Sequence, residues 1–130
     1  MSGETNLAKL IKNMTPKLND GEYVFSTVKS FDGINRKDTI CEFKEEEGVT
    51  IVIEKSKADA MKLDYQYVAS WISLEIHSSL EAVGLTAAFS KALAKYDISC
   101  NVIAGYYHDH IFVAKKDADK AMKILKELSK

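Results

Sequence analysis

The sequence has few cysteines, no long hydrophobic run and no excess of positive charge. Its two cysteines, Cys41 and Cys100, lie far apart and without C-x-x-C spacing, which excludes a disulfide framework, a zinc ribbon and a dithiol redox motif. We expect both to be reduced, buried thiols. No apolar stretch approaches the roughly 20 residues that a bilayer requires, and no signal peptide is visible. These absences predict a cytoplasmic protein that does not bind membranes.

The charge balance also argues against a nucleic-acid partner. The chain has 18 Lys and Arg residues against 19 Asp and Glu residues, whereas a nucleic-acid binder usually carries a basic excess. It contains no Walker loop, no G-x-G-x-x-G fingerprint and no G-x-S-x-G nucleophile elbow. Hydrophobic residues make up 46% and charged residues 28% of the 130 residues, as in ordinary globular proteins. The length allows one domain or two small fused modules.

Hydrophobic periodicity in the first half predicts a helix, three strands and a second short helix. Apolar residues with helical spacing, ending before Pro16, are Leu7, Leu10, Ile11 and Met14. Runs rich in β-branched and aromatic residues predict strands at 23–28, 39–44 and 49–54, the last two as a hairpin. Ser56 and Asp59 have an acidic variant of the capping-box spacing, which predicts a helix that begins after Ser56.

The second half predicts the order strand, helix, strand, strand, helix. A long apolar run at 67–76 predicts a strand buried on both faces. The clearest helical stripe consists of Leu85, Ala88, Phe89, Ala92, Leu93 and Tyr96. Strands are expected at 98–102 and 106–113, followed by a helix that buries Ala118, Ala121, Met122, Leu125 and Leu128. This is the split βαβ unit of ferredoxin-like folds without its last strand, which the first half could supply.

Three consecutive features of the second half resemble the ACT-domain pattern. They are the string Glu81-Ala82-Val83-Gly84-Leu85, the helical stripe, and the string Ile98-Ser99-Cys100-Asn101-Val102. The longer string from Trp71 to His110 is similar to small stand-alone bacterial tandem ACT proteins without assigned function. The resemblance implies an α+β chain of two ferredoxin-like, ACT-type βαββαβ modules, with antiparallel sheets and helices on one face. The two halves could exchange elements. It further implies a divergent N-terminal module at 1–65 and an ACT domain at 66–130.

The same resemblance implies a function in regulation. ACT modules are typically non-catalytic sensors that bind an amino acid or a similar small metabolite at a module interface, and they commonly pair their sheets. We therefore expect a homodimer without a cofactor that is not an enzyme and that signals to a protein partner the sequence does not identify. The candidate ligand-binding residues are His77, Ser78, Ser79, Glu81, Val83, Gly84, Leu85, Thr86, Asn101, Asp109 and His110.

Elementary chemistry supports a site at Gly84. A residue without Cβ lets a ligand approach the main chain, and the N–H groups at a helix start favour a carboxylate. Glu81 or Asp109 could pair with a ligand amino group. Ser78 and Glu81 also have capping-box spacing, so they could serve the backbone instead.

The histidines support a rival hypothesis, a small metal-dependent or acid/base enzyme that uses His77, His108 and His110. In a strand at 106–113, His108 and His110 would share one face and could bind a metal together. No fixed-spacing partner set such as H-E-x-x-H accompanies them. We therefore predict that these imidazoles line a pocket or satisfy buried polar groups, and we predict no metal site.

Overall fold

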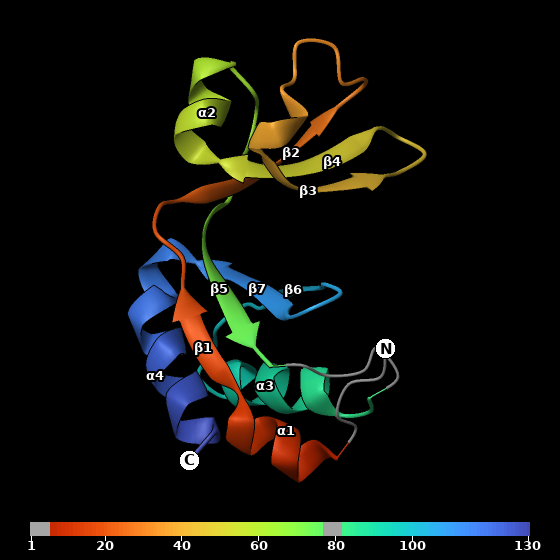
Figure 1. The fold of residues 1–130 in the computed structure, drawn as a ribbon. Helices are drawn as coiled ribbons and strands as arrows, with labels where there is room; N and C mark the ends of the chain where they lie inside the picture. The colour runs from red at the N-terminus through yellow and green to blue at the C-terminus, as the bar shows by residue number, and fades with distance from the viewer. Residues whose placement is uncertain (1–5, 77–81) are drawn as a thin grey trace. The chain divides into compact units, whose positions relative to one another are not determined.

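The computed structural model describes residues 6–76 and 82–130 (Figure 1). The chain forms two compact units: unit 1 comprises Met1–Asn19 and Ser70–Lys130, and unit 2 comprises Asp20–Ala69. Strand β5 (Val68–Glu75) passes from unit 2 to unit 1 after Ala69. The N-terminal segment thus folds with the C-terminal half, which confirms that the halves exchange elements.

Unit 2 is an antiparallel sheet with one short α-helix. Its elements are β2 (Tyr23–Val28), the 3-10 helix η1 (Arg36–Asp38), β3 (Thr39–Lys44), β4 (Val49–Glu54) and α2 (Lys55–Ala60). The strand order is β3-β4-β2, with the first two residues of β5 paired beside β2. A core of Val24, Ile51, Ile53 and Ala58 is buried between the sheet and α2. The three strands predicted for the first half are confirmed.

The predicted capping box of α2 is wrong. The helix begins one residue earlier than expected, with Glu54 as its N-cap, so Ser56 lies inside the helix. Its hydroxyl donates to Glu54 Oε1 at 3.2 Å. Asp59 instead accepts from Lys55 Nζ at 2.8 Å and from the Tyr65 hydroxyl at 2.6 Å. Asp59 therefore ties the helix to the segment that follows it.

Unit 1 is the larger unit, a sheet with helices against one face. Its elements are α1 (Leu7–Asn13), β1 (Thr15–Leu18), β5, α3 (Leu85–Ala94), β6 (Asn101–Ala104), β7 (Asp109–Ala114), the 3-10 helix η2 (Lys115–Asp117) and α4 (Ala118–Leu128). The strand order is β1-β5-β7-β6. Strand β1 pairs antiparallel with β5, from Thr15 opposite Glu75 to Leu18 opposite Ile72. It supplies the last strand that the second half lacks.

The two faces of the unit 1 sheet differ in character. Alternate residues of β5 and β7 enter the core together with residues of α1, α3 and α4, among them Leu10, Ile72, Leu74, Phe89, Ile111, Val113 and Leu125. The intervening residues of β5 and β7 carry Trp71, Ser73, His110 and Phe112 to the other face, as the alternation of a strand requires. None of the described helices is long and apolar enough to cross a membrane.

Three predicted boundaries in unit 1 shift. Helix α3 ends at Ala94, because residues 95–97 form a turn in which Asp97 has φ +62°. Strand β6 begins at Asn101 instead of residue 98, although Ile98 is buried as expected. Strand β7 begins at Asp109 instead of residue 106. A turn at 105–108 therefore contains His108, which the sequence placed in the strand.

Candidate functional site

Gly84 is the N-cap of α3, as its position before the helical stripe predicted. Its φ of +97° lies in the left-handed region, which favours glycine. Its carbonyl accepts the Ala88 N–H at 2.9 Å, the first bond of the helix. A Cβ on Gly84 would lie 3.0 Å from Leu7 Cδ2, so α1 also packs closely here. Gly84 thus serves the backbone and the packing of α1, and it leaves the helix start without a capping side chain.

The neighbours of Gly84 differ in what they can offer a ligand. Val83 is 83% exposed, and Thr86 is also exposed on the first turn of α3. The Leu85 side chain lies in the core, so only its main chain is available. The candidates His77, Ser78, Ser79 and Glu81 lie outside the described residues.

Asp109, the first residue of β7, is a buried carboxylate with only 8% of its surface exposed. No hydrogen bond or ion pair within residues 6–76 and 82–130 reaches this carboxylate. Burial raises the pKa of Asp109, while the nearby His110 and His108 oppose this shift. Burying a charged group without a partner is costly, so the side chain is poised to accept a cation or a hydrogen-bond donor.

His110 belongs to a polar network on the face of the sheet away from the helices. Trp71 Nε1 donates to His110 Nδ1 at 3.1 Å. Since an indole N–H can only donate, Nδ1 accepts and the neutral ring carries its proton on Nε2. The Ser73 hydroxyl lies 3.1 Å from the same nitrogen and accepts from Asn19 Nδ2 at 3.0 Å. Burial lowers the pKa of His110, and His108 lowers it further, while Asp109 opposes the shift; the net effect favours the neutral ring.

The strand pairing places Asp109 toward the start of α3. Ser73 lies beside His110, and the Trp71 ring stacks on Phe112 with centroids 6.2 Å apart, so β7 runs antiparallel to β5. The beginning of β7 therefore lies at the end of β5, from which the chain continues to Gly84. Asp109 and the N-terminus of α3 are therefore both on the side of unit 1 where β5 ends.

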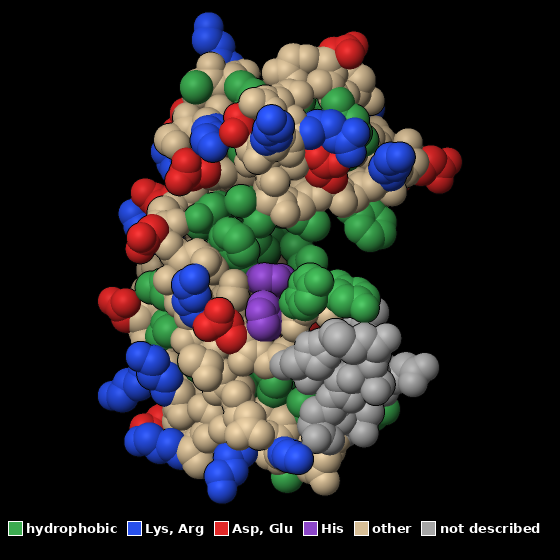
Figure 2. All heavy atoms as spheres, viewed as in Figure 1, with side chains coloured by type: hydrophobic (Ala, Val, Ile, Leu, Met, Phe, Trp, Pro, Cys, Tyr) green, Lys and Arg blue, Asp and Glu red, His purple; other side chains and the backbone are tan. Residues whose placement is uncertain are grey.

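His108 lies outside strand β7, which corrects the predicted start of that strand, but the side chains of His108 and His110 lie next to each other on one face of the molecule (Figure 2). His108 lies in the turn before β7, where its carbonyl accepts the Gly105 N–H at 3.0 Å. Its Nδ1 is buried and has no hydrogen-bond partner in the described part of the chain. Figure 2 shows histidine side chains at the surface beside hydrophobic side chains. His108 can therefore offer one unsatisfied ring nitrogen next to Asp109.

Other predicted groups lie apart from this arrangement. Asn101, on β6, donates from Nδ2 to the Phe112 carbonyl at 3.4 Å and pairs with Phe112 further along β7. Among the described residues, no three His, Cys, Asp or Glu side chains gather closely enough to hold a metal ion. Cys41 and Cys100 are free thiols, but both are half-buried and not fully buried as expected.

The sequence interpretation missed the partners of His110. Trp71 and Ser73 are two apart in β5 and so face the same side, a signal that was available in the sequence. Asn19 follows β1 directly, and its backbone N–H and its side chain both donate to the Trp71 carbonyl, at 2.9 and 3.2 Å. No local pattern could reveal that bond, because it depends on the position of β1.

Two family models, both described as ACT domain, match residues 2–70 and residues 66–127. A solved structure similar over almost the whole chain is a protein of unknown function from Vibrio cholerae, VC0802, described as a possible transport protein. It is 46% identical, with 95% of this chain and 96% of that chain covered and a TM-score of 0.87. Among curated proteins, none matches the sequence.

Two more distant structures share the fold. Protein Atu0741 from Agrobacterium tumefaciens is 15% identical, covers 89% of each chain and has a TM-score of 0.71. The ligand-free regulatory subunit of aspartate kinase from Thermus thermophilus is 9% identical, with 92% of this chain and 100% of that chain covered and a TM-score of 0.65.

Proposed function

Because the chain belongs to the ACT-domain family, we propose that it is a non-catalytic regulatory module that binds an amino acid or a similar small metabolite in unit 1. The α-carboxylate of the ligand binds main-chain N–H groups at the start of α3, beside Gly84. The α-ammonium binds Asp109. The similarity to a regulatory subunit of aspartate kinase supports the class of function, since that subunit has the same fold.

The observation that carries the proposal is the buried Asp109 carboxylate, which has no hydrogen-bond or ion-pair partner among residues 6–76 and 82–130. A zwitterion supplies the missing cation and places its own anion where a helix start attracts one. Each charge-assisted hydrogen bond contributes about 1.5–3 kcal/mol net, so two or three reach the roughly 4–8 kcal/mol of a millimolar to micromolar binder. Such an affinity suits a metabolite sensor.

Binding in unit 1 can be transmitted through self-association. We propose a cytoplasmic homodimer whose contact surface changes with ligand occupancy, because ACT modules commonly pair their sheets. Sedimentation equilibrium with and without ligand tests this part. A monomer under both conditions contradicts it.

The experiment that tests the site is a thermal-shift screen with the twenty amino acids, followed by calorimetric titration of each hit. A ligand that binds only the folded state stabilises it by about 2.7 kcal/mol at one hundred times its Kd. Asp109→Asn should abolish the shift, because the amide cannot neutralise an ammonium. Asp119→Asn is the matched control, since Asp119 is exposed on α4 and should leave binding unchanged.

Ligand analogues separate the two ends of the proposed site. The 2-oxo acid of a hit retains the carboxylate but lacks the ammonium, so it should bind at least about tenfold more weakly, as the loss of one charge-assisted bond requires. Equal binding of the amino acid by the wild-type protein and Asp109→Asn would overturn the assignment of Asp109. If none of the twenty amino acids shifts the transition at millimolar concentration, the ligand class is wrong.

A further inference from the structure

A concavity lies on the helical side of unit 1, between α3 and α4. Its volume is about 490 Å³, within the range of small-molecule sites. Its lining residues are Ala92, Lys95, Tyr96, Lys120, Lys123, Ile124, Glu127 and Leu128. We call it the α3–α4 groove. It shares no residue with the Gly84 and Asp109 site.

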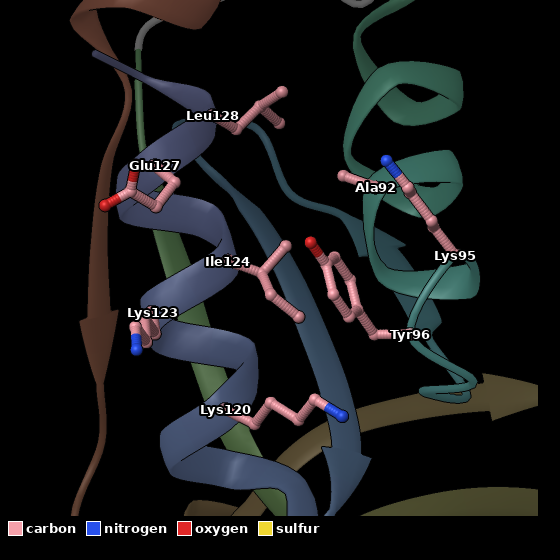
Figure 3. Close-up of a pocket in the computed structure, with 8 residues that line it drawn as sticks. All are labelled: Ala92, Lys95, Tyr96, Lys120, Lys123, Ile124, Glu127 and Leu128. Carbon is pink, nitrogen blue, oxygen red and sulfur yellow. The ribbon is translucent and has the colours of Figure 1, made fainter.

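The floor of the groove is apolar. Ile124 and Leu128 are half-buried, pack against the unit 1 core and point toward α3 in Figure 3. Ala92 faces them from α3, and the Tyr96 ring, 47% exposed, stands between the two helices. Partly exposed apolar surface of this kind, bounded by polar side chains, marks binding sites more often than isolated exposed residues do.

The charges that face the groove are positive. The Lys120 ammonium extends across the gap, 5.4 Å from the centre of the Tyr96 ring, and Lys95 runs back along α3 beside Ala92 (Figure 3). The one acidic lining residue, Glu127, points away from the gap and pairs with Lys130 Nζ at 3.1 Å. No carboxylate among the lining residues therefore neutralises the two ammonium groups across the apolar floor.

The last carbonyls of α3 carry a partial negative charge, which would repel an anion in the groove. Here this repulsion is weaker than at an uncapped helix C-terminus. The carbonyls of Lys91, Leu93 and Ala94 accept N–H groups of residues 95–98 at 2.9–3.1 Å. The wider surroundings are also basic: residues 85–130 carry eight lysines against five acidic residues, although the whole chain has a net charge of -1. The blue side chains along α4 in Figure 2 are lysines.

The lysines and the paired Glu127 of the α3–α4 groove exclude two other occupants. A second copy meeting this face would bring lysines against lysines, which is unfavourable. An amino acid would find no carboxylate for its ammonium, since Glu127 is already paired. What fits is an anion with an apolar body and no positive charge.

We propose that the α3–α4 groove binds a small amphipathic anion, a carboxylate or phosphate with an aliphatic or aromatic body. The apolar part lies on Ile124 and Leu128, and the anionic group lies between Lys95 and Lys120. Tyr96 covers the body of the ligand and keeps Lys120 oriented by its cation–π contact. This site is separate from the proposed amino-acid site, so the chain can respond to two kinds of metabolite.

The test uses octanoate as the probe and the ¹³C-methyl NMR signals of Ala92, Ile124 and Leu128 as the readout. Two matched compounds accompany it: acetate keeps the charge without the chain, and octyltrimethylammonium keeps the chain with the opposite charge. We expect octanoate alone to shift these three signals. The double variant Lys95→Gln/Lys120→Gln should weaken octanoate binding about tenfold or more, as the loss of one or two charge-assisted contacts requires.

The control is Lys91→Gln/Lys126→Gln, which removes two exposed lysines of the same helices that do not line the groove. It should change the affinity less than twofold, and Asp109→Asn should leave octanoate binding unchanged. Equal affinity of the two double variants would overturn the proposal. Equal shifts with octyltrimethylammonium would also overturn it, because they would identify an apolar surface without selectivity for anions. Octanoate shifts confined to other residues would overturn it as well.

Discussion

Deleting residues 1–19 removes α1 and β1 from unit 1 and leaves the whole of unit 2 in the chain. Among residues 6–19, two side chains of the buried core are lost with the segment: Leu10, 1% exposed, and Met14, 3% exposed. Truncating one buried Leu or Met side chain costs about 2–5 kcal/mol. The loss of both is therefore about 4–10 kcal/mol, which is comparable to the 5–15 kcal/mol that stabilises a typical domain. We expect unit 1 to unfold or to become marginally stable.

The assay is urea denaturation followed by tryptophan fluorescence. Trp71 is the single tryptophan of the chain and lies in unit 1, so its emission reports on that unit. The truncated protein should show an exposed tryptophan, or a midpoint far below that of the full chain. A synthetic peptide of residues 6–19, added in trans, should restore the native emission because it brings back both α1 and β1.

A point variant provides the quantitative control. Leu10→Ala should lower the free energy of unfolding by about 2–5 kcal/mol, whereas Lys12→Ala, on the exposed side of α1, should change it by less than about 0.5 kcal/mol. If the truncated chain unfolds at the midpoint of the full protein, the exchanged segment does not stabilise unit 1, and the reasoning fails.

Four further predictions concern unit 1. The pKa of His110 is lowered from 6.5, so the unfolded chain binds more protons than the folded chain. The free energy of unfolding should therefore fall as the pH drops below about 6.5. Denaturation at pH 7 and pH 5.5 checks this, and an equal free energy of unfolding at both pH values contradicts it. Trp71→Phe removes the donor to Nδ1 and should raise the pKa of His110 in an NMR titration. Gly105→Ala places a Cβ 2.8 Å from the His108 carbonyl oxygen and should cost about 1–3 kcal/mol in a denaturation assay; an unchanged midpoint would show that the turn can relax. Phe89→Ala, at a fully buried position, should cost about 3–5 kcal/mol, and a loss below 1 kcal/mol would contradict its place in the core.

Most elements could be predicted from the sequence because their periodicities are local. The apolar stripe that begins at Leu85 could be recognised because it lies on one face of a single helix. The β3–β4 hairpin could be recognised because two runs rich in β-branched and aromatic residues flank a polar turn. Strand β1 could not be found in this way, because its four residues include Pro16 and show no alternation of buried and exposed positions. It is an edge strand, where proline is tolerated, and only its pairing with β5 makes it a strand.

The candidate site shows the same limit at the level of single residues. Gly84 could be located because a glycine before a helical stripe has a direct structural meaning, and its positive φ confirms the helix start. The burial of Asp109 could not be derived from neighbours such as His108 and His110, since it depends on which end of β5 lies beside the start of β7. Side-chain hydrogen bonds between distant strands, such as Trp71 to His110, are likewise invisible to local patterns.

The insertion of unit 2 between β1 and β5 has a kinetic consequence. Asn19 and Ser73 must meet although they are 54 residues apart in the chain, and closing so long a loop is slow and entropically costly. Within unit 2, however, Tyr23 pairs with Ala69. Once that pairing forms, the two ends of the intervening segment are held together and the remaining loop is short. Early folding of unit 2 would therefore hold β1 and β5 close together and speed the folding of unit 1.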